Sequence, residues 1–530
     1  MTRARLTLYD TTLRDGAQTD GIDFTVEDKR HVIAMLDGIG IDVIEGGYPG
    51  ANPVDTALFA GLPEARARLA AFGMTKRAGR SAANDPGLRE LVEAGGDIVT
   101  FVAKAWDFHV RVALGCTLEE NLESVRDSVR AVVEAGKTAM LDAEHFFDGY
   151  KANPDYALQV VTTAIEAGAE TVILCDTNGG TLPHEVSAIV AKVCAHVPGG
   201  RLGIHAHDDT GHAVANSLAA IEAGARQIQG TLNGLGERCG NANLVTLIPT
   251  LMLKADYAER FETGVTPEAL ATLTHVSRAF DELLNRAPAR QSPYVGLAAF
   301  ATKAGIHASA IVKAPESYEH VAPESVGNAR RLLVSGQGGR SNVLAVLDRL
   351  GLEARRDDPR IGRLVELVKE REALGYAYEA AEASFELLAR RTLGQVPDFF
   401  QVESFRATVE GRFNARGEKI AVSEAVVKVV IDGETYMSVA EGNGPVNALD
   451  AALRKDLGRY QAAIDDLRLS DFKVRILNGG TEAITRVLIE SMDGEGRRWW
   501  TVGVSPNLVE ASFDALMDAI TYKLLATDAA

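Results

Sequence analysis

Short apolar segments alternate with longer amphipathic ones over the first 250 residues. Eight of the short segments have the composition of buried strands: 6–10, 42–46, 69–74, 97–102, 138–144, 171–176, 202–207 and 227–233. Each is followed by a stretch with helical periodicity, such as 119–135, where apolar residues recur at spacings of three and four. Parallel strands need such crossovers, so eight units predict an α/β fold with a (β/α)8 TIM barrel, here over residues 1–265.

An open doubly wound sheet is the alternative interpretation of the same alternation. The sequence Gly-x-Gly-x-x-Gly does not follow the first strand, which weakens a dinucleotide-binding interpretation. Beyond the barrel, residues 266–397 are dominated by helical patterns, and 361–392 is the clearest helix. This segment lacks Pro/Gly/Ser low complexity, so we expect helical linker subdomains and not a flexible tether.

The pattern changes again over residues 398–530, where it occurs twice. Strands are predicted at 405–409, 425–431 and 434–440, followed by a helix from Pro445, and then at 472–476, 483–490 and 499–504, followed by a helix from Pro506. Proline is tolerated in the first turn of a helix. Two copies of three strands and a helix predict a separate C-terminal α+β regulatory domain with internal pseudo-symmetry.

Composition narrows the classes of partner. The 530 residues carry a net charge of −18, with 46% hydrophobic and 24% charged residues, as expected for a folded protein of several domains. This charge repels phosphate backbones and anionic lipid, so we expect no nucleic-acid or membrane partner. The four cysteines stand alone, which argues against a disulfide framework and a zinc knuckle. Without a signal-peptide pattern at the start, we expect a cytoplasmic protein.

The strongest chemical signal is the pair His205 and His207 at the end of the seventh predicted strand. Residues two apart on a strand face the same side, so both imidazoles would project into the barrel mouth. Asp15 follows the first strand, which closure of a barrel brings beside the seventh and eighth, and it could add a carboxylate ligand. Arg14 beside it offers a fork of donors. A lone His-x-His or Arg-Asp pair would be weak evidence, since each is common without a metal.

A glycine-rich segment, 234–243, follows the eighth strand and permits a close backbone approach. Asn241 within it could add an oxygen ligand, although the segment could also be a simple connection. Two imidazoles, one carboxylate and one amide suit Zn, Mn, Mg or Co, and ligand type does not choose among them.

Further polar residues lie at other strand ends: Glu45, Glu144, Asp176 and Thr177. An acid near a metal-held carbonyl could transfer protons, but a structural hydrogen-bonding role stays open for each. His307 lies in the helical linker, where a lone histidine is usually a structural or surface group.

Taken together, 13–16, 205–207, 236–242 and 303–307 resemble the 2-isopropylmalate, homocitrate and citramalate synthase family. The resemblance implies a metal-dependent barrel enzyme that condenses acetyl-CoA with a 2-oxo acid. Segments 10–18, 45–50 and 142–149 are most similar to the citramalate synthase branch, which implies pyruvate as cosubstrate and a place in isoleucine biosynthesis. Two departures stand out: Ala206 where isopropylmalate synthases usually have cysteine, and Asp142 where some pyruvate-specific relatives have an aromatic residue.

The same resemblance implies roles for individual residues. Asp15, His205, His207 and Asn241 would hold the divalent metal. Arg14 and Thr177 would bind the substrate, and Arg14 would also stabilise the developing alkoxide. The base would be Glu144 or His307, and Tyr318 would assist His307. His307 would act on the barrel of a partner subunit, so the resemblance implies a homodimer or higher homo-oligomer. Segment 441–448 is similar to the family's regulatory turn, which implies isoleucine as an allosteric effector.

Three alternatives remain open from the sequence. The nearest is a 2-isopropylmalate synthase that uses 2-oxoisovalerate in leucine biosynthesis. A lyase similar to hydroxymethylglutaryl-CoA lyase ranks lower, because the run 237–241 resembles the synthase version of this loop. The alternative outside enzymes is a metabolite-sensing protein on a degenerate barrel, which the filled metal and arginine positions weigh against.

Overall fold

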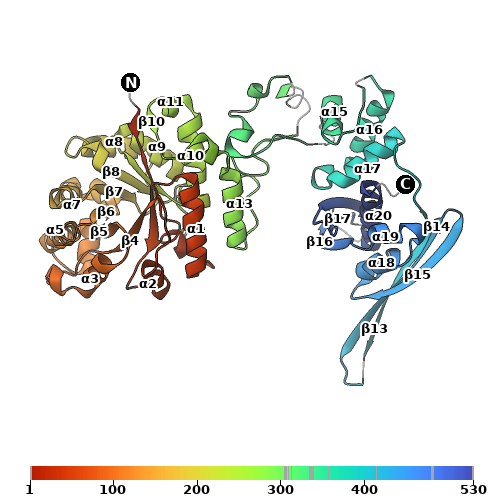
Figure 1. Cartoon of the computed structure of the whole chain (residues 1–530), viewed down its shortest axis with the longest axis horizontal. Coiled ribbons are helices and arrows are strands. Elements are labelled where there is room, and N and C mark those ends of the chain that lie inside the picture. Colours follow the sequence, from red (N-terminus) through yellow and green to blue (C-terminus); the bar gives the residue numbers. More distant parts are fainter. Residues whose placement is uncertain are drawn as a thin grey trace. The chain divides into compact units, whose positions relative to one another are not determined.

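The computed structural model of the chain forms two compact units (Figure 1). One comprises residues 1–300 with 321–330, and the other comprises 301–320 with 331–530. The structure describes residues 3–303, 307, 310–311, 313–333, 339–355, 357–413, 415–478 and 483–527.

The first unit is built on a closed barrel of eight parallel strands. In barrel order these are β2 (Thr7–Asp10), β3 (Val43–Gly47), β4 (Arg68–Met74), β5 (Ile98–Lys104), β6 (Thr138–Glu144), β7 (Thr171–Asp176), β8 (Leu202–Ala206) and β9 (Gln227–Gly230). The barrel closes where β9 pairs in parallel with β2. The predicted TIM barrel and all eight of its predicted strands are therefore confirmed.

Helices surround these strands (Figure 1). They are α1 (Val26–Ile39), α2 (Pro53–Phe59), α3 (Pro86–Glu93), α4 (Asp107–His109), α5 (Leu118–Glu134), α6 (Phe146–Ala152), α7 (Pro154–Ala167), α8 (Pro183–Val193), α9 (Ala213–Ala223), α10 (Leu244–Leu253), α11 (Ala255–Ala258), α12 (Pro267–Leu270) and α13 (Leu273–Leu283). The helix predicted at 119–135 is α5: Thr117 and Glu120 form a capping box at its start, and Val125, Val129 and Val132 are buried. The short strands β1 (Ala4–Arg5) and β10 (Phe261–Glu262) pair beside the barrel.

The barrel interior changes character along its axis. An apolar cluster fills its middle, formed by Tyr9, Val43, Ala70, Ile98, Met140, Ile173 and Cys175. Towards the carboxyl ends of the strands, buried polar residues replace it: Glu45, Thr100, Asp142, His205 and Gln229. The carboxyl end is where TIM barrels carry their active sites.

The second unit opens with a helical segment. Strands β11 (Ala301–Thr302) and β12 (Arg331–Leu332) pair, and α15 (Arg340–Arg349), α16 (Pro359–Ala373) and α17 (Glu382–Leu393) follow. The single helix predicted over 361–392 is therefore wrong: it is two helices. Gly375 has φ +109, a left-handed conformation that ends the first of them and that side chains other than glycine's rarely adopt.

The C-terminal repeat is confirmed as two antiparallel three-stranded sheets, each followed by a helix. The first copy is β13 (Gln401–Phe413), β14 (Lys419–Ile431), β15 (Glu434–Gly442) and α18 (Pro445–Leu453). The second is β16 (Arg468–Ile476), β17 (Thr485–Met492), β18 (Arg498–Ser505) and α20 (Leu508–Ala526), and α19 (Gln461–Ile464) lies between the copies. Pro506 does not open α20 as predicted, because Asn507 caps this helix by accepting from the Val509 N–H. Among the described helices, none combines the length and apolarity needed to cross a membrane.

Candidate active site

The loop after β2 holds Arg14 and Asp15 in a tight turn. The Thr11 carbonyl oxygen accepts from the backbone N–H groups of Arg14, Asp15 and Gly16. The Thr12 hydroxyl donates to Asp10 (2.7 Å) and accepts from the Leu232 N–H (2.8 Å). These bonds tie the turn to the loop after β9, across the closing seam of the barrel, so the position of Asp15 depends on barrel closure.

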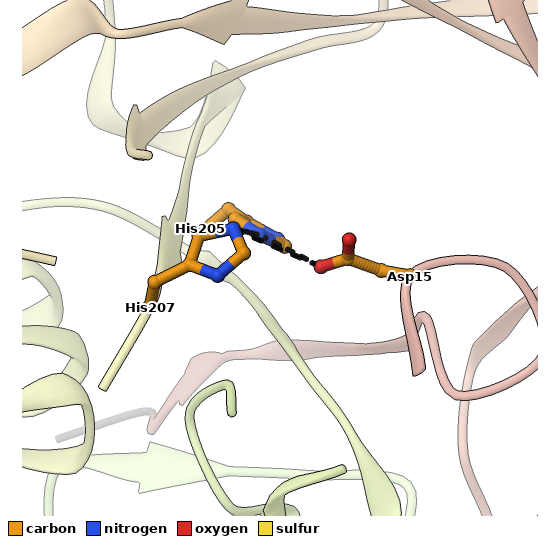
Figure 2. A group of neighbouring side chains, drawn as sticks. All are labelled: Asp15, His205 and His207. Atoms are coloured by element: carbon orange, nitrogen blue, oxygen red, sulfur yellow. Dashed lines mark hydrogen bonds and ion pairs between the residues drawn. The ribbon is translucent and has the colours of Figure 1, made fainter. Parts of the chain in front are cut away.

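Asp15, His205 and His207 converge on one point. Asp15 Oδ2 lies 3.2 Å from His205 Nε2 and 3.9 Å from His207 Nε2, and the two Nε2 atoms are 3.3 Å apart. All three residues are buried, and among the described residues they are the only group of three or more His, Cys, Asp or Glu side chains with this convergence. Figure 2 shows both imidazole rings facing the Asp15 carboxylate. The sequence brings these groups together from opposite ends of the barrel-forming segment, as predicted.

Buried atoms without hydrogen-bond partners lie on two of these residues and on Asn241, whose backbone is bridged to that of His207. Asp15 Oδ2, His207 Nδ1 and Asn241 Oδ1 are buried and lack a hydrogen-bond partner among the described residues. Buried polar atoms are rarely left so, and a site that binds an ion is one ordinary reason. A carboxylate, two imidazole nitrogens and an amide oxygen form a mixed donor set that suits Zn, Mn, Mg or Co.

Asn241 reaches this region because the loop after β9 is rich in glycine. A side chain at Gly236 would place its Cβ 2.3 Å from Asn241 Nδ2, a clash that only glycine avoids. The Asn241 amide donates to the Leu235 carbonyl (3.2 Å), and its oxygen keeps free lone pairs. The glycines of 234–243 therefore permit the close approach that the sequence predicted.

Charge and burial shift the pKa values of the three residues in different directions. Burial alone would raise the pKa of Asp15, but the Arg14 charge and the nearby His205 imidazole outweigh it and hold the pKa well below its usual range. Burial lowers the pKa of His205, but the neighbouring Asp15 carboxylate outweighs burial and raises it. Burial and the neighbouring His205 lower the pKa of His207 to about 3. Asp15 is thus ionised and His207 neutral, the forms in which both bind metals.

Arg14 is oriented by three neighbours. Its Nε donates to Glu45 Oε1 (2.5 Å), its Nη1 donates to Asp15 Oδ1 (3.1 Å), and its Cζ lies 3.9 Å above the centre of the Phe72 ring. Its Nη2 lies 3.9 Å from the Asp142 carboxylate, beyond hydrogen-bond distance. The guanidinium is therefore fixed beside the metal-ligand cluster with donors to spare for an anion.

The other acids at strand ends divide into different environments. Glu45 is fully buried between Arg14 and the Tyr9 hydroxyl (2.6 Å). Asp176 accepts from the Thr181 hydroxyl (2.8 Å), so hydrogen bonds of the β7 loop occupy it. Glu144 ends β6 and pairs with Lys104, and it keeps partial exposure. Only Glu144 among these three therefore reaches solvent at the barrel mouth.

Thr177 follows β7 and contacts the segments that follow β6 and β9. Its hydroxyl oxygen accepts from the His145 N–H (2.8 Å), and its backbone carbonyl accepts from Arg238 (2.8 Å). A hydroxyl that accepts one bond retains its own O–H as a donor. Thr177 can therefore donate to a ligand without losing the bonds that place it.

His307 and Tyr318 lie together in the second unit. Their ring centroids are 4.3 Å apart, and both side chains are exposed. Of the motif 303–307, residues 304–306 lie outside the described residues. The structure brings these two predicted residues into contact with each other.

Sequence reasoning missed Gln229, which contacts His205 inside the barrel. Its Oε1 lies 2.8 Å from His205 Nδ1. One signal could have found it: Gln227 and Gln229 place two amides on the same face of a strand that must be buried.

Family models match three segments of the chain. Residues 5–276 match the HMGL-like family, residues 294–373 match the homocitrate synthase post-HMGL domain-like family, and residues 379–524 match the LeuA allosteric (dimerisation) domain. The first match covers the barrel and every candidate metal ligand. The last covers the C-terminal repeat.

Relatives extend this similarity over nearly the whole chain. An (R)-citramalate synthase of Streptomyces coelicolor is 50% identical over 98% of this chain and 96% of its own length. An (R)-citramalate synthase of Synechocystis is 48% identical over the same shares. A probable 2-isopropylmalate synthase of Methanopyrus kandleri is 32% identical over 97% of this chain and 98% of its own length.

Proposed function

The chain belongs to the (R)-citramalate synthase family, and from this premise we propose that it condenses acetyl-CoA with pyruvate and water to give (R)-citramalate and CoA. Membership of this family makes the chain an acyltransferase and argues against a non-catalytic sensor. The convergence of Asp15, His205 and His207 beside Arg14 is the observation that carries the proposal. A barrel that had lost its chemistry would have no need to keep buried ligand atoms unsatisfied.

A divalent cation, held by Asp15, His205, His207 and Asn241, would supply Lewis-acid polarisation of the 2-oxo acid's carbonyl. Arg14 then donates to the oxygen on which negative charge develops as the new carbon–carbon bond forms. Its fixed orientation matters, since a donor that is already in place needs no reorganisation during the reaction. Thr177 donates its O–H to the substrate carboxylate.

A base must remove a proton from the methyl group of acetyl-CoA. Glu144 is one candidate, because it reaches solvent at the barrel mouth and a lysine neighbour accompanies it. His307 of a partner subunit, assisted by Tyr318, is the other, and the contact between their rings supports a shared role. Glu144→Gln and His307→Gln separate them: the true base, when replaced, loses exchange of the acetyl-CoA methyl protons with solvent.

The choice of oxo acid is tested by CoA release. We expect faster release with pyruvate than with 2-oxoisovalerate, in line with the higher identity to citramalate synthases than to the 2-isopropylmalate synthase. Release of thiol is followed with a thiol reagent at saturating acetyl-CoA. A preference for 2-oxoisovalerate would overturn the assignment in favour of leucine biosynthesis.

Regulation and assembly complete the proposal. We place the enzyme in isoleucine biosynthesis in the cytoplasm, as a homodimer or higher homo-oligomer, with isoleucine as allosteric effector of the C-terminal repeat. The match of residues 379–524 to the LeuA allosteric (dimerisation) domain supports this. The proposal includes domain boundaries near 265 and 397. Isoleucine added to the full chain should slow CoA release from pyruvate, whereas an equal concentration of leucine should not. An equal response to both amino acids would contradict the effector.

A further inference from the structure

A buried chain of three side chains crosses the carboxyl end of the barrel. Gln229 on β9 lies between His205 on β8 and Asp142 on β6 and is fully buried. Its Oε1 is 2.8 Å from His205 Nδ1, and its Nε2 donates to Asp142 Oδ1 (3.0 Å). Both ends of one carboxamide are therefore engaged, one by a candidate metal ligand and the other by an acid.

The chemistry of the amide fixes the direction of both bonds. A carboxylate oxygen accepts, so the amide NH2 of Gln229 faces Asp142 and its oxygen faces His205. The oxygen can only accept, so His205 must carry its proton on Nδ1. In the neutral ring the lone pair then lies on Nε2, the nitrogen that is 3.2 Å from Asp15 Oδ2 and 3.3 Å from His207 Nε2.

We propose that Gln229 and Asp142 form a positioning relay that holds His205 in the tautomer able to bind the metal. The inference rests on the metal site of the proposed function and adds residues that do not bind the metal themselves. Partners behind a metal-binding histidine commonly set its tautomer and ring orientation.

His207 shows what the relay supplies. Its Nδ1 is buried and has no hydrogen-bond partner among the described residues, so no such bond selects its tautomer. The two imidazoles thus differ: a hydrogen bond fixes the tautomer of His205, whereas His207 can adopt either tautomer.

Asp142 also links the relay to the substrate-binding side. Its Oδ2 lies 3.9 Å from Arg14 Nη2, and the residue is only 4% exposed. Without an acceptor at residue 142, the Gln229 amide can turn over, present its NH2 to His205 Nδ1 and drive the proton onto Nε2. That arrangement blocks the nitrogen that faces Asp15.

Metal affinity tests the relay directly. Metal-stripped protein is titrated with Mn²⁺ or Zn²⁺ against a chromophoric chelator, for the wild type, Gln229→Leu and Asp142→Leu. We expect both variants to bind about 10- to 100-fold more weakly. Asp142→Asn keeps an acceptor oxygen for Gln229, and Gln229→Glu keeps an acceptor for His205, so both should stay within a few-fold of wild type.

Gln227→Leu is the matched control. Gln227 lies on the same face of β9, is 2% exposed and donates to Met140 Sδ (3.8 Å) rather than to a candidate metal ligand. Its replacement removes a buried amide of the same kind, so affinity should not change. A loss of affinity in Gln227→Leu equal to that in Gln229→Leu would mean general damage to the barrel and would overturn the relay.

A second measurement needs no variant. Nitrogen-15 NMR of histidine-labelled, metal-free wild type, at a pH high enough for a neutral ring, should show His205 protonated on Nδ1. Protonation on Nε2 would overturn the relay. Wild-type protein that binds no metal would instead defeat the proposed function, so the two failures are distinguishable.

Discussion

Charged residues lie at both ends of the barrel, but the two ends differ in how completely their polar atoms are paired. At the amino-terminal end, a cavity of about 430 Å³ is lined by Asp37, Arg66, Arg68 and Glu170 among others. There Arg66 pairs with Asp37 and Arg68 pairs with Glu170. At the carboxyl end, Asp15 Oδ2, His207 Nδ1 and Asn241 Oδ1 have no hydrogen-bond partner within the part of the chain that the structure describes.

This contrast shows that the presence of a cavity does not locate the chemistry. The amino-terminal end holds a cavity, yet its charged residues pair with one another, and barrels rarely place active sites at that end. The carboxyl end keeps buried atoms unsatisfied, which costs stability unless a ligand completes them. Buried polar atoms without hydrogen-bond partners are thus a more informative sign of function than a cavity.

Replacing Arg14 should break the carboxyl end most severely. In Arg14→Ala, CoA release should fall about 100- to 1,000-fold, or about 3–4 kcal/mol, because a preset donor to the developing oxyanion is lost. Arg68→Ala at the amino-terminal end is the control and should keep near-normal turnover. Because Arg14→Ala also removes the ion-pair partner of the buried Glu45, a thermal unfolding curve must show that the variant folds. Normal turnover by folded Arg14→Ala would refute the role.

Metal removal should have the next largest effect. The unsatisfied atoms predict that a divalent ion stabilises the fold, by about 2.7 kcal/mol at a concentration 100 times its Kd. Chelator-treated protein should therefore melt earlier, lose CoA release, and recover both when Mn²⁺ or Zn²⁺ returns. Asp15→Asn should abolish the metal-dependent shift in melting temperature, whereas Asp37→Asn should retain it. Full activity after complete stripping would contradict the assignment.

Stability against pH sharpens the comparison further. Burial raises the pKa of Asp10 to about 7, although hydrogen bonds from Thr12 oppose the shift. The unfolded chain releases this proton near 3.8 and the folded chain only near 7, so the stabilising contribution is complete below the lower value and is lost as pH rises to the upper one. The slope approaches 1.4 kcal/mol per pH unit for a full proton.

Asp10→Asn should remove this slope. Urea unfolding of wild type and variant at pH 5, 6, 7 and 8 gives the difference in free energy of unfolding at each pH. We expect the difference to change steadily up to about pH 7 and then to level. A difference that does not vary with pH would show that Asp10 ionises at its ordinary value.

The sequence predicted the barrel well because each strand and helix carries its own periodicity. It also predicted the convergence of Asp15 with His205 and His207, since barrel closure follows from counting eight units. It could not predict the Gln229–Asp142 contact, because residues 87 apart meet only once the barrel interior is built. The helix break near Gly375 was missed for a local reason. The amphipathic pattern continues across it, whereas the helix ends at a single glycine in the left-handed conformation.

The smallest effect should come from the paired charges at the amino-terminal end. Arg68 and Glu170 are 3.1 Å apart, but their side chains are 38% and 50% exposed, so solvent screens the pair. A double-mutant cycle with Arg68→Ala and Glu170→Ala should give a coupling energy of about 0.2–1 kcal/mol that shrinks as salt rises. Turnover should not change in any of the three variants. A coupling above this range, or a loss of CoA release, would mean that this end takes part in function after all, and pairing would then cease to distinguish the two ends.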